Sequence, residues 1–446
     1  MKKLTAAVSV IVMLSGCASE AELVSFGEDL PVIVETAPVE VPISYELSDI
    51  RSDSELCKMT EDSKQRRDFS MRFASFPAVS GPKLLDRIGS TKIALIPIDW
   101  REQPGSSDDL NYYKQQAENL TNFYRVMSQG RHQIDWVVAD SWFRVDINFE
   151  DFKIPYGGDA SYEEESISKK EEFLDALVSV SDPYFDFSDI DVVNFVTPRG
   201  FGFDEGIYGF ADASFGGQIR TNEKVIGNYF IPGKHEQDDF YSPAWIWYAH
   251  EYAHTLGFPD VRNSEESGYQ DVTAVAHELM GLSWGPIRYF SVWLRWVAEW
   301  VDNEQVICLT PDQITENIYE IHTGFIGSED TLAVMVRFSE TETVVIESRR
   351  NQSFDAITDI GEGNRYEGVV IYTVDSNMGH SEGFMQSVYP DGREDKEPII
   401  WDEEGFGMGS ELLNVVFHEG DFVEIYGISI EVLQTGDGKD VVSLSY

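Results

Sequence analysis

The spacing of hydrophobic residues across residues 86–305 changes between two periods, and each period predicts one kind of element. Residues 91–100 form a nearly unbroken apolar run, which is typical of a buried strand. Residues 110–128 repeat at helical spacing, with an apolar stripe made of Tyr113, Leu120, Phe123, Tyr124 and Met127. The pattern further predicts one or two strands in 132–145, an acidic helix in 162–180 and a buried strand in 190–196. These elements predict helices packed on a strongly twisted sheet.

From about residue 306 onward, the pattern becomes that of short alternating strands separated by turn residues. The expected strands are 332–337, 343–348, 368–374, 422–426, 429–433 and 441–446. We therefore expect an all-β, sandwich-like domain over residues 306–446, and an α+β fold class for the chain. No catalytic constellation occurs in this stretch, so we expect this domain to have a supporting or recruiting role and not a catalytic one.

Residues 242–260, SPAWIWYAHEYAHTLGFPD, predict the helix around which the candidate chemistry gathers. Ser242 is a suitable N-cap, Pro243 suits the first helical position, and Gly257 stands where helices often stop in a left-handed turn. His250 and His254 are four residues apart, so both rings lie on one face and can bind one metal ion. The stop at Gly257 lets the chain turn back and bring a third ligand to that metal.

Residues near the two histidines supply the rest of a metal site. Glu251 can act as base for a water that the metal activates. Asp260 is the nearest candidate for the third ligand, and Glu278 is its rival. Met280 precedes a tight Gly/Ser/Trp turn, which forms a hydrophobic floor below the metal in metzincin proteases, although methionines also fill core gaps. A bare HExxH arises by chance in many helices, but the longer HExxHxxGxxD string with this turn favours a metal site.

HEYAHTLGFPD (250–260), followed by ELMGLSWGP (278–286), resembles the M6 family of zinc metallopeptidases, the immune inhibitor A type. The resemblance covers roughly residues 85–380, through the segments 122–130, 188–195, 345–350 and 368–375. It departs from the family in two places. The chain has Val261-Arg262-Asn263 where the family usually continues with Tyr-Asp, and Glu278 where the family tends to have Asp. The resemblance implies a zincin-like catalytic domain over 86–305, with a twisted sheet and an active-site helix.

The expected function is that of a zinc endopeptidase acting on protein or peptide substrates. Two histidines and a carboxylate suit Zn²⁺, so the expected ligands are His250, His254 and either Asp260 or Glu278, with Glu251 as general base. One alternative is a catalytically inactive surface adhesin or binding lipoprotein on the same scaffold, against which the base and both histidines are intact. Another is a zinc amidase acting on a non-protein substrate.

Acidic residues outnumber basic residues by 79 to 33, which gives a formal net charge of −46. A chain this acidic repels phosphate backbones, so nucleic-acid binding is excluded as a function. The acidity either keeps the protein soluble in salty surroundings or supplies carboxylates for Ca²⁺ sites, and composition does not separate these interpretations. A hydrophobic content of 42% and an aromatic content of 13% support folded cores.

The N-terminus has the pattern of a bacterial lipoprotein precursor. Residues 1–16 have a basic start and a short apolar core, as in a signal peptide, and end in Leu-Ser-Gly before Cys17. Cys17 is the expected lipidation site, so the membrane is reached through the lipid anchor only; ordinary secretion is the alternative. Residues 17–85 are expected to be a tether and lead-in segment. Ala18 favours attachment to the outer membrane or cell surface over retention in the inner membrane.

The two remaining cysteines, Cys57 and Cys308, are expected to form a disulfide in an oxidising exported compartment. Two buried thiols are the alternative, and a third interpretation has Cys57 blocking the metal from a removable pro-segment.

Four further segments bear on the cleft. The Gly-rich residues 200–217 are either a flexible rim or a surface loop, and 225–230 predict an edge strand for a peptide substrate. Residues 289–301 predict an aromatic core helix. Tyr269 and Tyr289 are candidate transition-state hydrogen-bond donors. His277 is expected to be a core or surface histidine with its hydrogen bonds satisfied, and not a metal ligand.

Overall fold

The computed structural model describes most of the chain downstream of the tether. The described residues are 45–59, 84–146, 164–200, 210–213, 219–231, 243–261, 277–281, 289–324, 328–350, 367–378, 382–393, 415–436 and 438–446. The chain divides into two compact units, Met1–Tyr45 and Glu46–Tyr446, and the described helices and strands lie in the second. The expected signal peptide, Cys17 and most of the expected tether and lead-in segment lie outside the described residues. Within the described part of the chain, no helix is long and apolar enough to span a membrane.

The N-terminal sheet is built around β1 (Gly89–Trp100), which pairs in parallel with β2 (His132–Val138) and β4 (Val192–Val196). Strand β3 (Phe143–Val145) pairs with the end of β1. Next to β4 lies parallel β8 (Asn228–Ile231), followed by antiparallel β5 (Phe210–Ala213), in the order β2-β1-β4-β8-β5. A separate two-stranded ribbon joins β6 (Ile219–Arg220) and β7 (Val225–Ile226).

The edge strand of this sheet differs from the prediction. Residues 225–230 were expected to form one edge strand, but they divide between β7 and β8, and β8 is covered by β5. Strand β5 comes from the Gly-rich stretch that was expected to be a rim or loop. Its four residues are too few to show an alternating pattern, and pairing with β8 rather than local propensity makes them a strand. The rest of residues 201–218 lies outside the described part.

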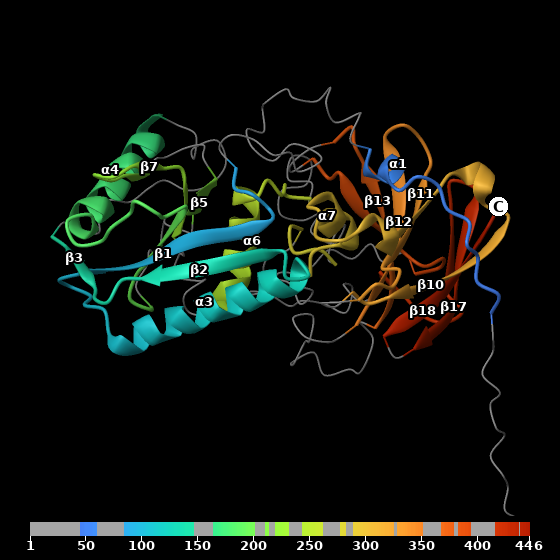
Figure 1. Ribbon diagram of the computed structural model, residues 1–446, viewed down its shortest axis with the longest axis horizontal. Coiled ribbons are helices and arrows are strands. Elements are labelled where there is room, and N and C mark those ends of the chain that lie inside the picture. Colours follow the sequence, from blue (N-terminus) through green and yellow to red (C-terminus); the bar gives the residue numbers. More distant parts are fainter. Residues whose placement is uncertain are drawn as a thin grey trace, which may run out of the picture. The chain divides into compact units, whose positions relative to one another are not determined.

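Helices cover both faces of the N-terminal sheet (Figure 1). Helices α3 (Ser107–Met127) and α6 (Ala244–Thr255) share one hydrophobic cluster, and α4 (Glu164–Ser181) belongs to the other. Strand β1 contributes alternate residues to each cluster: Ile93 and Leu95 pack with α3 and α6, whereas Ala94 and Ile96 pack with α4. The unbroken apolar run in the sequence thus reflects burial on both faces of the sheet.

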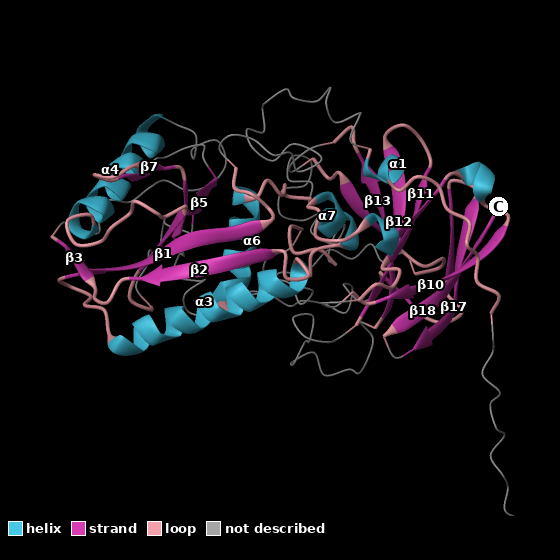
Figure 2. Ribbon diagram, in the orientation of Figure 1, coloured by secondary structure: helices cyan, strands magenta, loops and turns pink. Residues whose placement is uncertain are grey.

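The C-terminal part consists of two sheets that enclose a core (Figure 2). One has the order β14-β13-β12-β11-β9, with β15 on β13, and the other has the order β10-β18-β17-β16. Their bounds are β9 Val306–Leu309, β10 Glu316–His322, β11 Ala333–Arg337, β12 Glu342–Arg349, β13 Gly368–Asp375, β14 Met385–Val388, β15 Val416–Phe417, β16 Phe422–Ile425, β17 Ile428–Gly436 and β18 Lys439–Ser445. The structure contains all six expected strands, and it adds β9, β10, β14 and β15.

A shared hydrophobic core crosses the predicted domain boundary at residues 305 and 306. Short helix α7 (Val292–Val297) packs in the same hydrophobic cluster as α3 and α6. The cluster also includes the face of the first C-terminal sheet that points away from the second sheet. In β12, Val345 belongs to this shared cluster, whereas Val344 and Ile346 face the second sheet.

The aromatic helix expected over 289–301 is shorter than predicted, because α7 spans only Val292–Val297. Glu299 takes a left-handed φ of 65°, and the N–H of Trp300 donates to the carbonyl of Arg295, which closes the helix.

The described part of the lead-in lies against the C-terminal sheets. The Ser48 N–H donates to the carbonyl of Ile318, and the Ser52 N–H donates to that of Cys308. Helix α1 (Glu55–Lys58) carries Cys57, which forms the expected disulfide with Cys308. The interpretation of Cys57 as a thiolate that blocks the metal is therefore wrong. Two short 3₁₀ helices, η5 (Asn303–Gln305) and η6 (Pro311–Gln313), flank β9.

Candidate metal centre

Helix α6 carries the two histidines. It begins one residue later than predicted and ends as predicted. Pro243 has ψ of 138°, so it is the N-cap and the helix begins at Ala244, one residue later than expected. Ser242 lies outside the described residues. At the other end, Gly257 takes a φ of +90°, as the sequence predicted. Its N–H donates to the His254 carbonyl and the Phe258 N–H donates to the Ala253 carbonyl, which is a Schellman motif.

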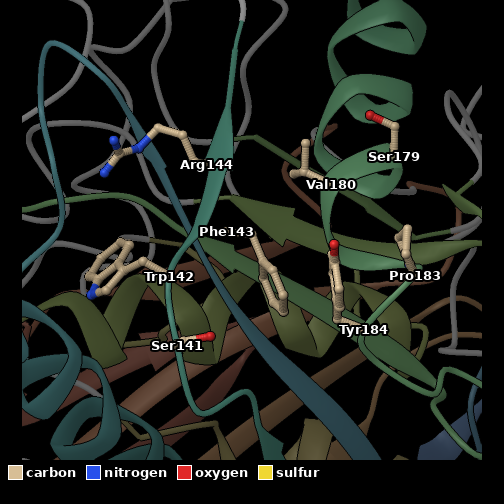
Figure 3. Close-up of a pocket in the computed structure, with 8 residues that line it drawn as sticks. All are labelled: Ser141, Trp142, Phe143, Arg144, Ser179, Val180, Pro183 and Tyr184. Carbon is tan, nitrogen blue, oxygen red and sulfur yellow. The ribbon is translucent and has the colours of Figure 1, made fainter.

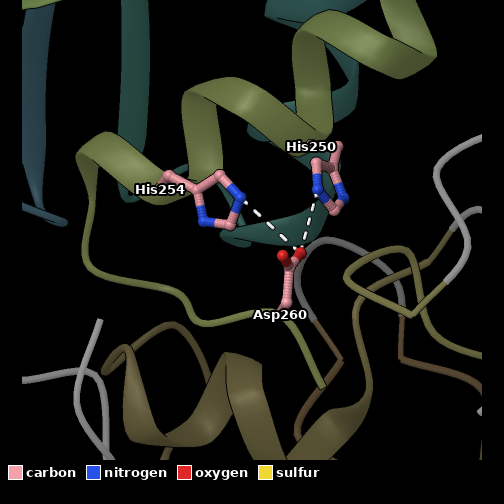
Figure 4. A group of neighbouring side chains, drawn as sticks. All are labelled: His250, His254 and Asp260. Atoms are coloured by element: carbon pink, nitrogen blue, oxygen red, sulfur yellow. Dashed lines mark ion pairs between the residues drawn. The ribbon is translucent and has the colours of Figure 1, made fainter. Parts of the chain in front are cut away.

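That turn brings Asp260 back to the helix, where its carboxylate meets both histidines (Figure 4). Oδ1 of Asp260 lies 3.1 Å from Nε2 of His250 and 3.6 Å from Nε2 of His254. One ligand atom from each of the three residues lies within 4.8 Å of the others. All three are buried, with exposed fractions of 5%, 8% and 7% for His250, His254 and Asp260.

Backbone carbonyls orient both imidazole rings. Nδ1 of His250 lies 3.1 Å from the carbonyl oxygen of Leu279, and Nδ1 of His254 lies 2.8 Å from that of Phe258. A carbonyl oxygen only accepts, so each Nδ1 carries the hydrogen and each Nε2 presents its lone pair toward Asp260. Two oriented imidazole nitrogens and one carboxylate oxygen are a donor set that fits a catalytic Zn²⁺ site, including the carbonyl partner on each ring.

Glu278, the rival third ligand, does not join this group. Its side chain is fully buried and accepts hydrogen bonds from the backbone N–H groups of Met280, at 3.2 Å, and Ser291. Burial raises the pKa of the Glu278 carboxyl to about 7, against the lowering effect of those hydrogen bonds and of Arg349. The structure therefore places Glu278 against the start of α7 and leaves Asp260 as the carboxylate beside the histidines.

Met280 is fully buried next to the chain at residues 260–261. Its carbonyl accepts from the N–H of Val261, at 3.2 Å, immediately after Asp260. Residues 282–288, which complete the expected turn, lie outside the described part. The floor role of Met280 stays a prediction.

Other candidate residues have distinct positions. Glu251 is half-buried on α6, directly after His250. Tyr289 is buried, and its carbonyl accepts from the N–H of Leu279 at 3.3 Å; Tyr269 lies outside the described residues. His277 is fully buried, and its Nδ1 lies 2.9 Å from the hydroxyl of Ser387. Burial and the nearby Arg349 hold the pKa of His277 well below its usual range, so it is a neutral core histidine. It is only half satisfied, because its buried Nε2 has no hydrogen-bond partner among the described residues.

Sequence reasoning missed a buried charged cluster beside the centre, made of Glu278, Glu347 and Arg349. Glu347 accepts from the N–H of Val292 at 2.7 Å and from the hydroxyl of Tyr372 at 2.8 Å. Nε of Arg349 lies 3.1 Å from Oε1 of Glu347. The available signal was a Glu-Ser-Arg-Arg run directly after an apolar strand, which normally indicates a strand leaving the core.

A cavity of about 580 Å³ lies away from this centre, between the β3 segment and the end of α4 (Figure 3). Its lining includes Phe143 and Tyr184, whose rings stack with centroids 6.3 Å apart. The guanidinium of Arg144 is engaged by both oxygens of Asp99, at 2.5 and 2.8 Å. None of the three metal-site residues lines the cavity, and it adds no chemistry to that site.

No protein-family model and no curated protein matches this chain. Among solved structures, a similar one is metalloproteinase-II from Bacteroides fragilis, at 15% sequence identity and a TM-score of 0.26. The alignment covers 55% of this chain and 61% of that protein, so the chain spans less than two thirds of its length. What can be concluded about this chain therefore comes from its own sequence and site.

Proposed function

We propose that this protein is an exported, lipid-anchored zinc endopeptidase. The proposal rests on one observation. Oδ1 of buried Asp260 lies close to Nε2 of both His250 and His254, whose rings are oriented by backbone carbonyls. The two histidines lie on the same helix as Glu251. The sequence resemblance of residues 250–260 and 278–286 to the M6 family supports the peptidase class.

Each residue has a defined task in this proposal. His250, His254 and Asp260 would hold the metal ion, which would supply Lewis acidity to the scissile carbonyl and lower the pKa of water. Glu251 accepts a proton from the attacking water and returns it to the leaving amine. The carbonyls of Leu279 and Phe258 keep the hydrogen of each histidine on Nδ1.

Strand β5 supplies a place for an extended substrate. It is the last strand in the order of the N-terminal sheet among the described strands, and it contacts helix α6. An exposed sheet edge binds an extended peptide through main-chain hydrogen bonds. This arrangement favours a peptide over the non-protein substrate of an amidase.

The test compares zinc content and peptide cleavage in the full chain, in Glu251→Gln and in a control, Glu118→Gln. Glu118 is exposed on α3, so the control makes the same change away from the site. We expect about one zinc per chain in all three proteins, with cleavage lost only in Glu251→Gln. Wild-type protein that binds zinc and cleaves no peptide in a random library would overturn the protease role. Cleavage of amidase substrates would then favour the amidase, and its absence would favour a binding role.

Lipid anchoring has a separate test. We expect radiolabelled palmitate to be incorporated in wild type and lost in Cys17→Ala, with the wild-type protein in the outer-membrane fraction. Equal labelling of both proteins, or release of wild type into the medium, would contradict the anchor.

A further inference from the structure

We propose that Arg349, at the end of strand β12 in the C-terminal sheets, is a positioning residue for the metal ligands. It acts through the backbone of residues 277–281, which we call the ligand-orienting segment. This inference rests on the proposed function, because it assumes that His250, His254 and Asp260 bind zinc.

The ligand-orienting segment contacts the metal site at two points. The carbonyl of Leu279 accepts from Nδ1 of His250 at 3.1 Å, which sets the rotation of that ring. The next carbonyl, that of Met280, accepts from the N–H of Val261 at 3.2 Å and so holds the chain beside Asp260. A displacement of this segment would therefore move two of the three ligands.

Arg349 binds the backbone of this segment. Its Nη2 donates to the carbonyl of His277, the first residue of the segment. The same nitrogen lies 3.5 Å from the carbonyl of Tyr289, which also accepts from the N–H of Leu279 at 3.3 Å. The guanidinium thus bridges the backbone at His277 and at Tyr289, in two segments that also bind each other through the Leu279 N–H and the Tyr289 carbonyl.

Arg349 also carries the positive charge between two buried carboxylates. It forms the ion pair with Glu347, while Glu278 binds the N–H groups of Met280 and Ser291. Arg349 is 6% exposed and both glutamates are fully buried. Removing one partner from such a cluster leaves uncompensated buried charge, so the surrounding backbone has to rearrange. Here that backbone is the ligand-orienting segment and the start of α7.

A purely structural ion pair would stabilise the fold without affecting the metal, and the chain offers a matched control for that case. Arg350, the next residue, is 5% exposed and pairs with fully buried Asp440 at 2.7 and 3.0 Å. Its other hydrogen-bond partners are the carbonyls of 349, 436 and 439 and the hydroxyl of Ser348, none of them in the ligand-orienting segment. Both arginines thus form buried ion pairs, and only Arg349 binds the segment.

The experiment measures the zinc dissociation constant by competition with a chromogenic chelator in the full chain, Arg349→Met, Arg349→Lys and Arg350→Met. Thermal unfolding of each zinc-free protein and the visible spectrum of each cobalt-loaded protein are recorded in parallel. We expect Arg349→Met to weaken zinc binding about tenfold or more, as changes behind metal ligands do, and to alter the cobalt spectrum. Arg349→Lys keeps the positive charge but loses the planar guanidinium with its several N–H donors, so we expect an intermediate loss of zinc affinity.

We expect Arg350→Met to lower the unfolding temperature comparably and to bind zinc within about threefold of wild type, because its partners lie outside the segment. Equal zinc affinities in the Arg349 and Arg350 variants would overturn the positioning role. If Arg349→Met does not fold, Arg349→Lys against Arg350→Met decides the question. Wild-type protein that binds no zinc would instead overturn the proposed function itself.

Discussion

Asp260 is ten residues from His250 in sequence, yet its Oδ1 lies 3.1 Å from Nε2 of that histidine. The turn at Gly257 makes this approach possible. Glu278, the other carboxylate near the motif, is committed to backbone N–H groups of Met280 and Ser291. The two acids therefore have different relations to the metal site, and substitutions can separate them.

Asp260→Ala removes the proposed third ligand, so we expect it to weaken zinc binding by more than about 100-fold. Glu278→Gln changes a group behind the ligands, for which the loss is roughly 10–100-fold. Chelator competition at fixed pH measures both constants. A larger loss in Glu278→Gln than in Asp260→Ala would mean that Glu278 is the third ligand.

Gly257→Ala places a β-carbon in a left-handed conformation, with φ of +90°. We expect it to lower the free energy of unfolding by about 1–2 kcal/mol. Gly130→Ala is the matched control, because Gly130, in the turn that follows helix α3, has a φ of +82° and open space around an added β-carbon. Urea unfolding should show similar losses for both variants. Only Gly257→Ala should also weaken zinc binding, since its turn carries Asp260, and equal zinc affinities would contradict this role.

Stability should fall in acid because of His132, which is buried with its Nε2 2.8 Å from the Tyr252 hydroxyl. Burial lowers the pKa of His132 to about 4 in the folded protein, from 6.5. The unfolded chain therefore takes up a proton first, and stability present above pH 6.5 is lost as pH falls toward 4. Over that range the loss approaches about 3 kcal/mol.

His132→Gln removes this titration. We expect the difference in unfolding free energy between wild type and His132→Gln to shift by about 2 kcal/mol in favour of the variant between pH 7 and pH 5. Urea unfolding with a chelator present measures it without interference from metal release. Parallel pH curves for the two proteins would show that His132 does not cause the loss.

The Cys57–Cys308 disulfide joins residues 251 positions apart and ties the lead-in to β9. Replacing both cysteines with serine should lower the free energy of unfolding by about 2–5 kcal/mol, as for other native disulfides. Zinc affinity should stay unchanged, because neither cysteine belongs to the metal site. A large loss of zinc binding in the folded double variant would show an unexpected coupling between the lead-in and the site.

Local signals were sufficient for several features. The four-residue spacing of His250 and His254 follows from helix geometry, and the stop at Gly257 follows from the freedom of glycine at positive φ. The apolar run of β1 indicated a buried strand, and the alternating segments after residue 331 indicated the C-terminal sheets. In each case the cause acts within a few residues along the chain.

Tertiary structure determined the rest. Strand β5 exists because β8 pairs with it, and Glu278 is held by α7 rather than by the histidines. Arg349 approaches the ligand-orienting segment from a strand about 70 residues further along the chain. Hydrophobic periodicity reports which residues are buried but not which distant backbone groups they meet. The sequence by itself therefore determined the histidine pair, the helix that presents it and the turn before Asp260, whereas the choice between Asp260 and Glu278, and the support behind the site, depended on long-range packing.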